Sequence, residues 1–272
     1  MTAAADYILG THDAELIRLG VQHRAWQPCV HAAWQSTGLA PGQTVLDVGC
    51  GPGHASLDLA ELVGPSGSVV AIDKSEKFLS ALSAESHRRK LENIITRRAD
   101  LDNGEFPDVM ADVAWCRWVF AFLTKPQRVL ARLAAAIRPG GMVVVHEYFD
   151  YSTWRAAPRC AELESFVKAV MASWRDAKGE PDIALSLPGW LEGLGFELRS
   201  LRPIVDVLQP GHPKWGWLRS FIEVGRQRLV DLRYLTASEA ESVWSAFQSV
   251  EAAPGTRMIT PAVLEIVAQK PV

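Results

Sequence analysis

The stretch that decides the fold runs from residue 45 to residue 54 and reads VLDVGCGPGH. An apolar run, Val45–Val48, leads into three glycines at alternate positions, Gly49, Gly51 and Gly53. Glycine lets the chain turn sharply and lets a ligand approach the main chain without a Cβ in the way. A helix that begins after such a turn points its N–H groups at that ligand. The stretch therefore predicts a strand, a ligand-binding loop and a helix in direct succession.

The spacing of the glycines separates the candidate ligands. A dinucleotide fingerprint, GxGxxG, would need glycine at position 54, where the chain has His54. Asp47 stands two residues before the first glycine, and a carboxylate there suits a ligand with an ammonium group better than one with a pyrophosphate. A nicotinamide-dependent oxidoreductase on a similar sheet is thus disfavoured and stays an alternative.

Short apolar runs alternate with helical stretches around this loop, which predicts βαβ units and a parallel sheet. The candidate strands are 44–48, 68–72, 94–98, 112–116 and 142–146, with helices near 54–63, 75–90 and 125–137. Upstream, the spacing of apolar residues predicts a helix over 13–37. Downstream we expect a helix over 158–177, strands over 196–205 and 262–269, and a mostly helical segment, 206–255, packed over one edge of the sheet.

Three successive predicted strands are each accompanied by an acid. Asp47 lies in the first, Asp73 ends the second, and Asp100 follows the third. The carboxyl ends of parallel strands meet at one edge of a sheet, so these acids should face one adenosine-like ligand. Asp73 could accept hydrogen bonds from both ribose hydroxyls, and Asp100 from an adenine amino group. Each acid alone has an ordinary alternative as a turn or cap residue.

Together these motifs resemble the class I S-adenosylmethionine-dependent methyltransferases, in particular the small-molecule branch of the ubiquinone/menaquinone-biosynthesis type. The resemblance is carried by VLDVGCGPG at 45–53, AID at 71–73, RRADL at 97–101, WCRWV at 115–119 and RPGG at 138–141. It implies an α/β, Rossmann-like sheet, mostly parallel with an antiparallel last strand. It also implies an N-terminal helical lid (1–40) and a methyltransferase domain (41–272). Within that domain we expect a cofactor-binding half (41–150) and a substrate-facing half (151–272) with the helical insertion.

The resemblance further implies which residues hold the cofactor, S-adenosyl-L-methionine, whose product is S-adenosyl-L-homocysteine. The glycine loop would pass under the methionine portion, Asp73 would bind the ribose, and Tyr7 would close over the methionine carboxylate. The full implied set is Tyr7, Asp47, Gly49, Cys50, Gly51, Gly53, Asp73, Lys74, Asp100, Leu101, Cys116 and Arg117.

Methyl transfer from a sulfonium is an in-line displacement that needs mainly alignment and desolvation. A hydroxyl or carbon acceptor usually also needs a general base. The strand at 142–146 leads into His146, Glu147 and Tyr148, our catalytic candidates. Strand alternation puts His146 and Glu147 on opposite faces, so one of them should face the ligand. A satisfied core histidine and a structural carboxylate are the alternatives, weighted equally.

The ten tryptophans are the unusual feature of the composition. Six of them fall after residue 150, in the part that sets substrate identity in such enzymes. We therefore expect a dry aromatic pocket for a flat or apolar acceptor, with ordinary core packing as the alternative. The candidate acceptor-binding residues are Trp118, Tyr151, Trp154, Trp215 and Trp217.

Composition narrows the remaining classes. The chain has 272 residues, 48% of them hydrophobic, and a net charge of −3, which favours a full core over disorder and disfavours nucleic-acid or membrane partners. Its four cysteines lie far apart, so we expect no metal site and a cytoplasmic location. The predicted function is methyl transfer to a small-molecule acceptor, with O-, N- and C-acceptors and a homodimer left open. A catalytically silent cofactor-binding protein is the main alternative.

Overall fold

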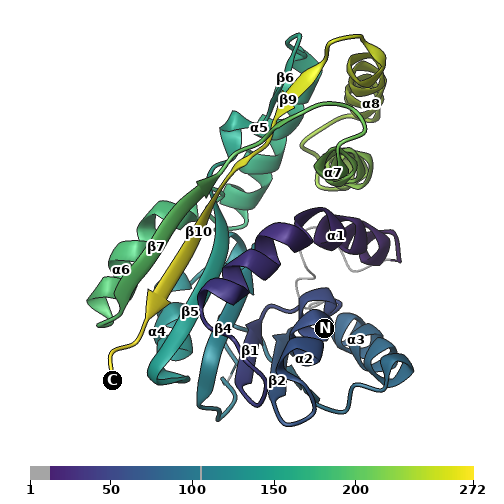
Figure 1. Ribbon diagram of the computed structural model, residues 1–272. Helices are drawn as coiled ribbons and strands as arrows, with labels where there is room; N and C mark the ends of the chain where they lie inside the picture. The colour runs from purple at the N-terminus through teal and green to yellow at the C-terminus, as the bar shows by residue number, and fades with distance from the viewer. Residues whose placement is uncertain (1–12, 105) are drawn as a thin grey trace, which may run out of the picture.

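A seven-stranded sheet forms the centre of the computed structural model, which describes residues 13–104 and 106–272 (Figure 1). The strand order is β3-β2-β1-β4-β5-β10-β7. Strands β1 to β5 are parallel, and β10 runs antiparallel to both of its neighbours. This confirms the predicted, mostly parallel sheet. The strands are β1 (Thr44–Val48), β2 (Ser68–Asp73), β3 (Ile94–Arg98), β4 (Ala111–Arg117), β5 (Ile137–Asp150), β7 (Glu197–Ile204) and β10 (Ala262–Gln269).

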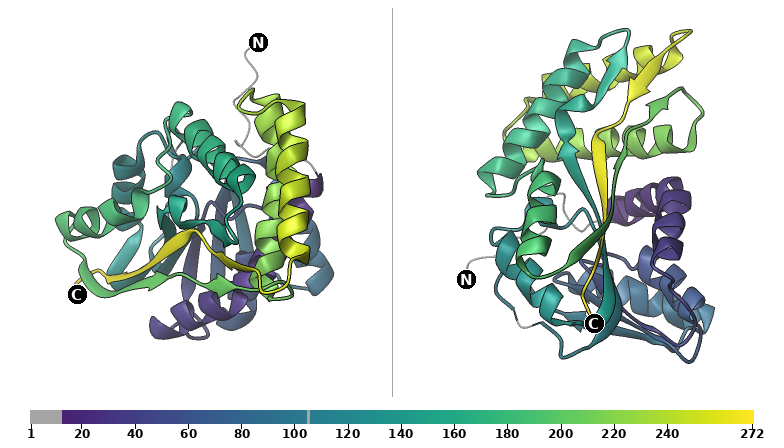
Figure 2. Two further views of the ribbon diagram at one scale, coloured as in Figure 1. Left: turned by 90° about the horizontal axis from the view of Figure 1, so that it is seen from above. Right: turned by 60° about the vertical axis from the view of Figure 1, so that its left-hand side comes forward.

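Helices cover both faces of this sheet (Figure 2). Successive strand residues point to opposite faces, so Val45 and Val113 pack in the core with α1 and α2, whereas Leu46 and Ala114 pack with α4 and α6. One face carries α1 (Asp13–Ser36), α2 (His54–Val63) and α3 (Glu76–Arg89), and the other carries α4 (Pro126–Ala135) and α6 (Leu187–Gly193). The apolar runs of the sequence are therefore buried on both sides.

A smaller layer stands beyond the C-terminal end of β5, with α1 lying between it and the main sheet (Figures 1 and 2). It consists of a three-stranded sheet, β6 (Arg155–Ala157), β9 (Arg257–Ile259) and β8 (Val207–Leu208), with α5 (Ala161–Asp176), α7 (Pro213–Asp231) and α8 (Ala237–Ala252). The segment 206–255 is mostly helical, as predicted, and it lies above the C-terminal ends of the strands. Buried apolar residues on α7 face α1, which explains this position.

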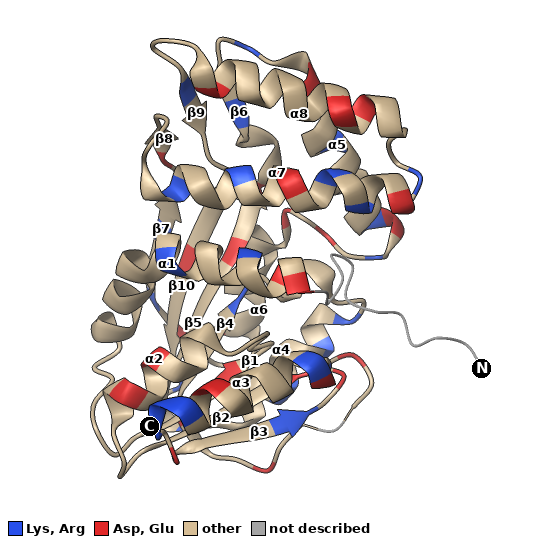
Figure 3. Ribbon diagram, turned by 90° about the vertical axis from the view of Figure 1, so that its right-hand side faces the viewer, with Lys and Arg blue, Asp and Glu red and all other residues tan. Residues whose placement is uncertain are grey.

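Charged side chains of both signs are interspersed on α7 and α8 (Figure 3). The two helices are joined by ion pairs, Arg226 with Glu241 at 3.1 Å and Arg219 with Glu251. Across the described residues, no helix combines the length and the apolarity that a membrane crossing requires.

Candidate functional site

A cavity opens at the C-terminal ends of the parallel strands, beneath α1. Its volume of about 180 Å³ is many times the roughly 15 Å³ that a single water needs on this measure. Most of the residues that the sequence assigned to the cofactor line it: Asp47, Gly49, Cys50, Gly51, Asp73, Lys74, Asp100, Leu101 and Arg117. Trp118, predicted for the acceptor, also lines the cavity.

Two described cofactor candidates, Gly53 and Cys116, do not line it. Tyr7 lies outside the described residues. Gly53 takes a left-handed backbone, and a Cβ there would collide with Leu82, so this glycine allows α2 to pack on α3. The Cys116 side chain is buried in the core on the α4 side of the sheet, and burial raises the pKa of its thiol well above the usual value.

The glycine loop and Asp73 hold each other in place. The Gly51 N–H donates to Asp73 Oδ2 at 2.9 Å, and the Ser75 N–H donates to Asp73 Oδ1 at 2.8 Å. Gly49 has a φ of 68°, and a Cβ there would collide with Val119. By contrast, a Cβ on Gly51 would meet no atom within 4 Å, so the main chain at Gly51 borders open space. Burial raises the pKa of the Asp73 carboxyl despite these two bonds.

Asp47 lies at the floor of the cavity and is 2% exposed. The Ser56 hydroxyl donates to Asp47 Oδ2 at 2.5 Å. Burial, partly offset by that hydrogen bond and by the Arg117 charge, raises the pKa of Asp47 to about 7. Its charge is therefore sensitive to any cation that enters the cavity.

Asp100 is a turn residue, and its predicted contact with adenine stays a prediction. Its Oδ1 accepts from the Asp102 N–H at 3.0 Å, and its Oδ2 accepts from the Asn103 amide at 3.1 Å, which shapes the turn after β3. The same residue lines the cavity beside Leu101.

Helix α1 contributes a polar chain that the sequence analysis did not assign. His23 Nε2 lies 3.0 Å from Asp58 Oδ2 of α2, and Arg117 Nη2 lies 3.3 Å from His23 Nδ1. A guanidinium can only donate, so Nδ1 is the acceptor and Nε2 carries the proton that points at Asp58. His23 lines the cavity, and no spacing in the sequence connects positions 23, 58 and 117.

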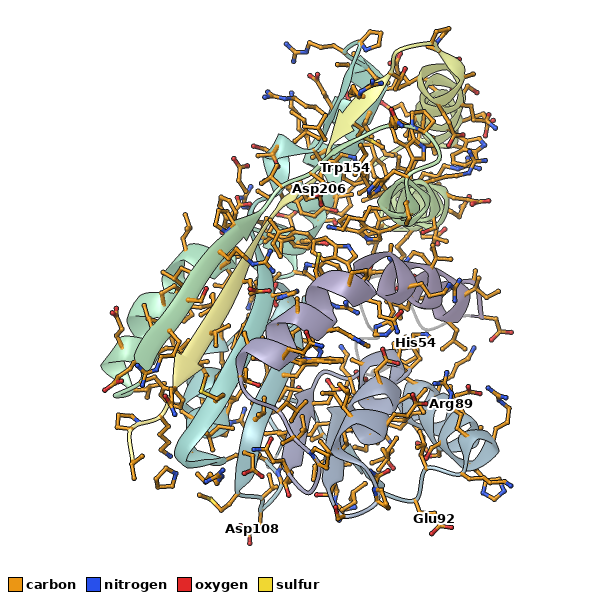
Figure 4. The ribbon with its side chains drawn as sticks, in the orientation of Figure 1. His54, Arg89, Glu92, Asp108, Trp154 and Asp206 are labelled. Carbon is orange, nitrogen blue, oxygen red and sulfur yellow. The ribbon has the colours of Figure 1, made fainter. Side chains whose placement is uncertain are left out.

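His54 is a further cavity residue that the site prediction left out (Figure 4 shows it between α1 and α2). Its ring stacks on His23 with centroids 5.7 Å apart, and its Nε2 is buried with no hydrogen-bond partner in the described part of the chain. Burial is the largest cause that lowers the pKa of His54, to about 4, with the nearby cationic side chains adding to it. The signal that could have found it was its position directly after Gly53.

His146 does not line the cavity, contrary to the expectation that it or Glu147 would face the ligand. It is fully buried, and its Nε2 lies 2.9 Å from Glu265 Oε2 of β10, which also accepts from Arg202 of β7 at 2.7 Å. Burial lowers the pKa of His146. His146, Glu265 and Arg202 thus link the neighbouring strands β5, β10 and β7.

Glu147 likewise lies outside the cavity lining, on the opposite face of β5. Its Oε1 accepts from the N–H groups of Val119 and Phe120 at 2.5 and 2.6 Å. These bonds hold the turn after β4, where Trp118 has a φ of 53° and donates its own N–H to the His146 carbonyl at 2.9 Å. Glu147 therefore positions the cavity residue Trp118 from behind.

Apart from Trp118, the aromatic candidates pack on other aromatic side chains and do not line the cavity. Tyr148 stacks on Trp118 with centroids 5.4 Å apart, and Trp217 stacks there at 5.6 Å. Tyr151 and Trp154 meet edge to face, and Trp215 packs against Phe247. The core-packing alternative describes Tyr151, Trp154, Trp215 and Trp217 better than a pocket wall does. Burial and pocket lining look alike in a sequence, which explains the difference.

Comparisons with known proteins point in one direction. Residues 45–141 match a family model described as a methyltransferase domain. A segment of 103 residues is 38% identical to nocamycin O-methyltransferase of Saccharothrix syringae, covering 38% of this chain and 37% of that protein. A segment of 149 residues is 29% identical to the ubiquinone/menaquinone biosynthesis C-methyltransferase UbiE of Cupriavidus taiwanensis, covering 54% and 58% of the two chains.

A solved structure shows the same fold over nearly the whole chain. Coclaurine N-methyltransferase, bound to N-methylheliamine and S-adenosylhomocysteine, superposes with a TM-score of 0.55 at 17% identity, over 89% of this chain and 72% of that one. The matched segments span less than two thirds of the two curated relatives. The resemblance seen in the motifs is confirmed for the sheet and its glycine loop, and S-adenosylmethionine is the cofactor that this family uses.

Proposed function

We propose that this chain, which carries a methyltransferase domain of the S-adenosylmethionine-dependent type at residues 45–141, transfers a methyl group to a small-molecule acceptor. The observation that carries the proposal is one cavity in which Asp47, Asp73 and Asp100 meet around the glycine loop. The three acids lie in or directly after successive strands of the sheet.

The described residues fit the cofactor at both of its ends. Open space over Gly51 leaves room for a ligand against the main chain. Gly53 caps α2 without a side-chain hydrogen bond, so the first N–H groups of this helix are available to a carboxylate. Asp47 suits the ammonium of the amino-acid portion, Asp73 the ribose hydroxyls, and Asp100 with Leu101 the adenine edge beside Lys74.

When bound, S-adenosylmethionine supplies an electrophilic methyl group on a sulfonium. The chain's contribution is to align the acceptor and to exclude water, which is most of what an in-line displacement needs. Helix α1 closes the cavity from above with Leu19, Gln22 and His23. Trp115 and Trp118 wall it beside the end of β4.

Titration calorimetry with S-adenosylhomocysteine tests the proposal. We expect micromolar-range binding by the wild type and at least a tenfold loss on Asp73→Ala, because two ribose hydrogen bonds to a carboxylate are lost. Asp108→Ala is the matched control, since Asp108 is exposed at the opposite end of the sheet (Figure 4). Unchanged affinity in Asp73→Ala would remove the ribose assignment.

Two further results separate the alternatives. S-adenosylhomocysteine found by mass spectrometry in the purified protein supports an enzyme, because turnover generates this product. Binding without any product formation supports a silent cofactor-binding protein. Failure to bind S-adenosylhomocysteine, together with clear binding of a nicotinamide dinucleotide, would support the oxidoreductase alternative.

A further inference from the structure

Two buried donors lie on the far side of the glycine loop from the acids assigned to adenosine. The sheet order β3-β2-β1-β4 places Asp100 and Asp73 on one side of the loop after β1, and Arg117 and Trp118 on the other. Arg117 Nη1 and Trp118 Nε1 are both buried with no hydrogen-bond partner among residues 13–104 and 106–272, and both residues line the cavity. Unpaired buried donors are rare and unfavourable, so their position indicates a missing acceptor atom.

The neighbours of Arg117 fix its orientation but leave one of its N–H donors, Nη1, without a partner among the described residues. Its Nη2 is taken by His23, which Asp58 holds in turn. Its guanidinium lies over the Trp118 ring, 5.0 Å from the centroid. The Asp47 carboxylate contributes attraction, but its Oδ2 accepts from Ser56. Nη1 is thus left for a ligand.

The backbone at Trp118 points the same way. A bulky residue with a φ of 53° is strained, and such strain persists where surrounding bonds enforce it, commonly at functional sites. Here Glu147 and the His146 carbonyl hold the turn. The fold therefore holds the Trp118 ring and its N–H beside Arg117.

The carboxylate of the cofactor has another place to bind. The first N–H groups of α2 lack a side-chain cap, and they adjoin the loop that would carry the methionine portion. Arg117 and Trp118 are then left for the second ligand of the reaction.

We propose that Arg117 Nη1 and Trp118 Nε1 receive an ionised oxygen of the acceptor, so that the acceptor is an oxygen acid and the methylated atom is that oxygen. This inference rests on the proposed function. The oxygen's lone pair forms the new bond to the methyl carbon, the carbon–sulfur bond breaks, and its electron pair stays on sulfur. A carboxylate becomes a methyl ester and a phenolate a methyl ether, with no proton left to remove.

The described histidines and the acid–base candidates of β5 provide no well-placed base, which agrees with this chemistry. Asp47, whose pKa is raised to about 7, lines the cavity but is assigned to the ammonium of the cofactor. His146 and Glu147 lie outside the cavity lining. His23 Nδ1 already accepts from Arg117. His54, with its pKa lowered to about 4, is a poor match for proton abstraction near neutral pH. An acceptor that is ionised in solution needs none of them.

The test titrates model acids into protein saturated with S-adenosylhomocysteine, followed by saturation-transfer NMR. Benzoate probes a carboxylate, 4-nitrophenolate at mildly alkaline pH probes a phenolate, and benzamide is the neutral control. We expect at least one anion to bind about tenfold more tightly than benzamide, as for a charge-assisted hydrogen bond. Whichever anion shows the preference identifies the class of oxygen acid.

Variants assign the preference to the two donors. Arg117→Gln should reduce anion binding to the level of benzamide, and Trp118→Phe, which keeps an aromatic ring but removes the N–H with part of the indole, should weaken it about threefold or more. Arg24→Gln is the matched control, because Arg24 is an exposed cation on α1 that does not line the cavity. Equal binding of anions and benzamide, or an anion preference that survives both variants, would overturn the inference.

A second pair of ligands tests the competing role of Arg117, which is to bind the carboxylate of the cofactor. S-adenosylhomocysteine carries the cofactor's carboxylate, and 5′-methylthioadenosine lacks it. If Arg117→Gln weakens only the former by tenfold or more, Arg117 binds the cofactor and the acceptor inference fails while the proposed function stands. If the wild type binds neither compound, the proposed function itself fails.

Discussion

Buried carboxylates set the electrostatics of the cavity residue by residue. Asp47 and Asp73 both have raised pKa values because burial disfavours their charged forms. Hydrogen bonds from Ser56 and from the glycine loop oppose this effect without cancelling it. A cationic ligand that binds beside such a carboxyl therefore shifts it toward its ionised form.

Asp47 should make the affinity for S-adenosylhomocysteine depend on pH. Its pKa of about 7 means that below this pH the carboxyl is mostly neutral, whereas the ligand's ammonium favours the ionised form. Binding must then release a proton, so the affinity should fall by up to about tenfold per pH unit below 7 and level off above it. Calorimetry between mildly acidic and mildly alkaline pH measures the slope.

The control ligand is 5′-methylthioadenosine, which has the ribose for Asp73 but no ammonium for Asp47. We expect a shallower pH dependence for it, and an Asp47→Asn variant should show the same shallow slope with both ligands. A steep slope that persists in Asp47→Asn would assign the titration to another group.

At the level of elements, α1 is held from both sides by polar contacts. Toward α2, Asp58 Oδ2 accepts from the Gln27 amide at 2.9 Å and lies 3.0 Å from both His23 and His31. Toward α7, Gln22 Oε1 accepts from Trp217 Nε1 at 3.1 Å. The same oxygen accepts from Arg18 at 2.8 Å, and Arg18 pairs with Glu15 through two bonds of 2.7 Å. The helix that closes the cavity is thus anchored to both layers.

The buried Glu15–Arg18 pair should stabilise the protein only as a pair. Glu15→Leu leaves the buried Arg18 without its carboxylate and should cost about 3–5 kcal/mol in the free energy of unfolding. The double variant Glu15→Leu/Arg18→Leu should recover most of that loss, because no buried charge remains. Urea unfolding measures both.

The exposed pair of Lys77 with Asp13 at 2.7 Å provides the comparison. Lys77→Ala should change the free energy of unfolding by less than about 1 kcal/mol, as surface ion pairs do. A double variant as unstable as Glu15→Leu would show that the site needs its charges.

The accuracy of the sequence predictions follows the range of the interactions involved. Strands β1, β3 and β10 have the predicted bounds, and β1 in particular is a mostly apolar or β-branched run that ends before Gly49. Strand β5 is longer than the predicted 142–146, since its first residues pair with β4 across an irregularity in register that local pattern does not reveal. The cavity residues of the contiguous glycine motif were found for the same reason as β1.

Contacts between segments that are distant in the chain could not be predicted from the sequence. The chain from Asp58 through His23 to Arg117 joins α2, α1 and β4, and only the folded structure brings these residues together. His146 and Glu147 were correctly placed on opposite faces of β5, but their partners Glu265 and Val119 are fixed by neighbouring segments. Periodicity predicts the face of a side chain and not what it meets there.

Over the whole molecule, an aromatic column joins the seven-stranded sheet to the smaller layer. Trp118, at the end of β4, is stacked between Tyr148 of β5 and Trp217 of α7. Trp26 of α1 meets both Trp118 and Trp217 edge to face, each with centroids 5.2 Å apart. Buried residues of α1, α5, α7 and α8 belong to the same core cluster as those on one face of the sheet. Three of the ten tryptophans, Trp26, Trp118 and Trp217, thus pack between the layers.

This shared core predicts that the two layers unfold together. Urea unfolding followed by far-UV circular dichroism and by tryptophan fluorescence should give coincident midpoints, as one cooperative transition requires. Trp217→Ala should lower both midpoints equally, with a loss of about 3–5 kcal/mol, because it opens a cavity where the layers meet. Trp244→Ala is the control, since Trp244 is only partly buried on α8 and its loss should be smaller. Two separate transitions in the wild type, or a shift confined to one probe in Trp217→Ala, would show that the smaller layer is an independent folding unit.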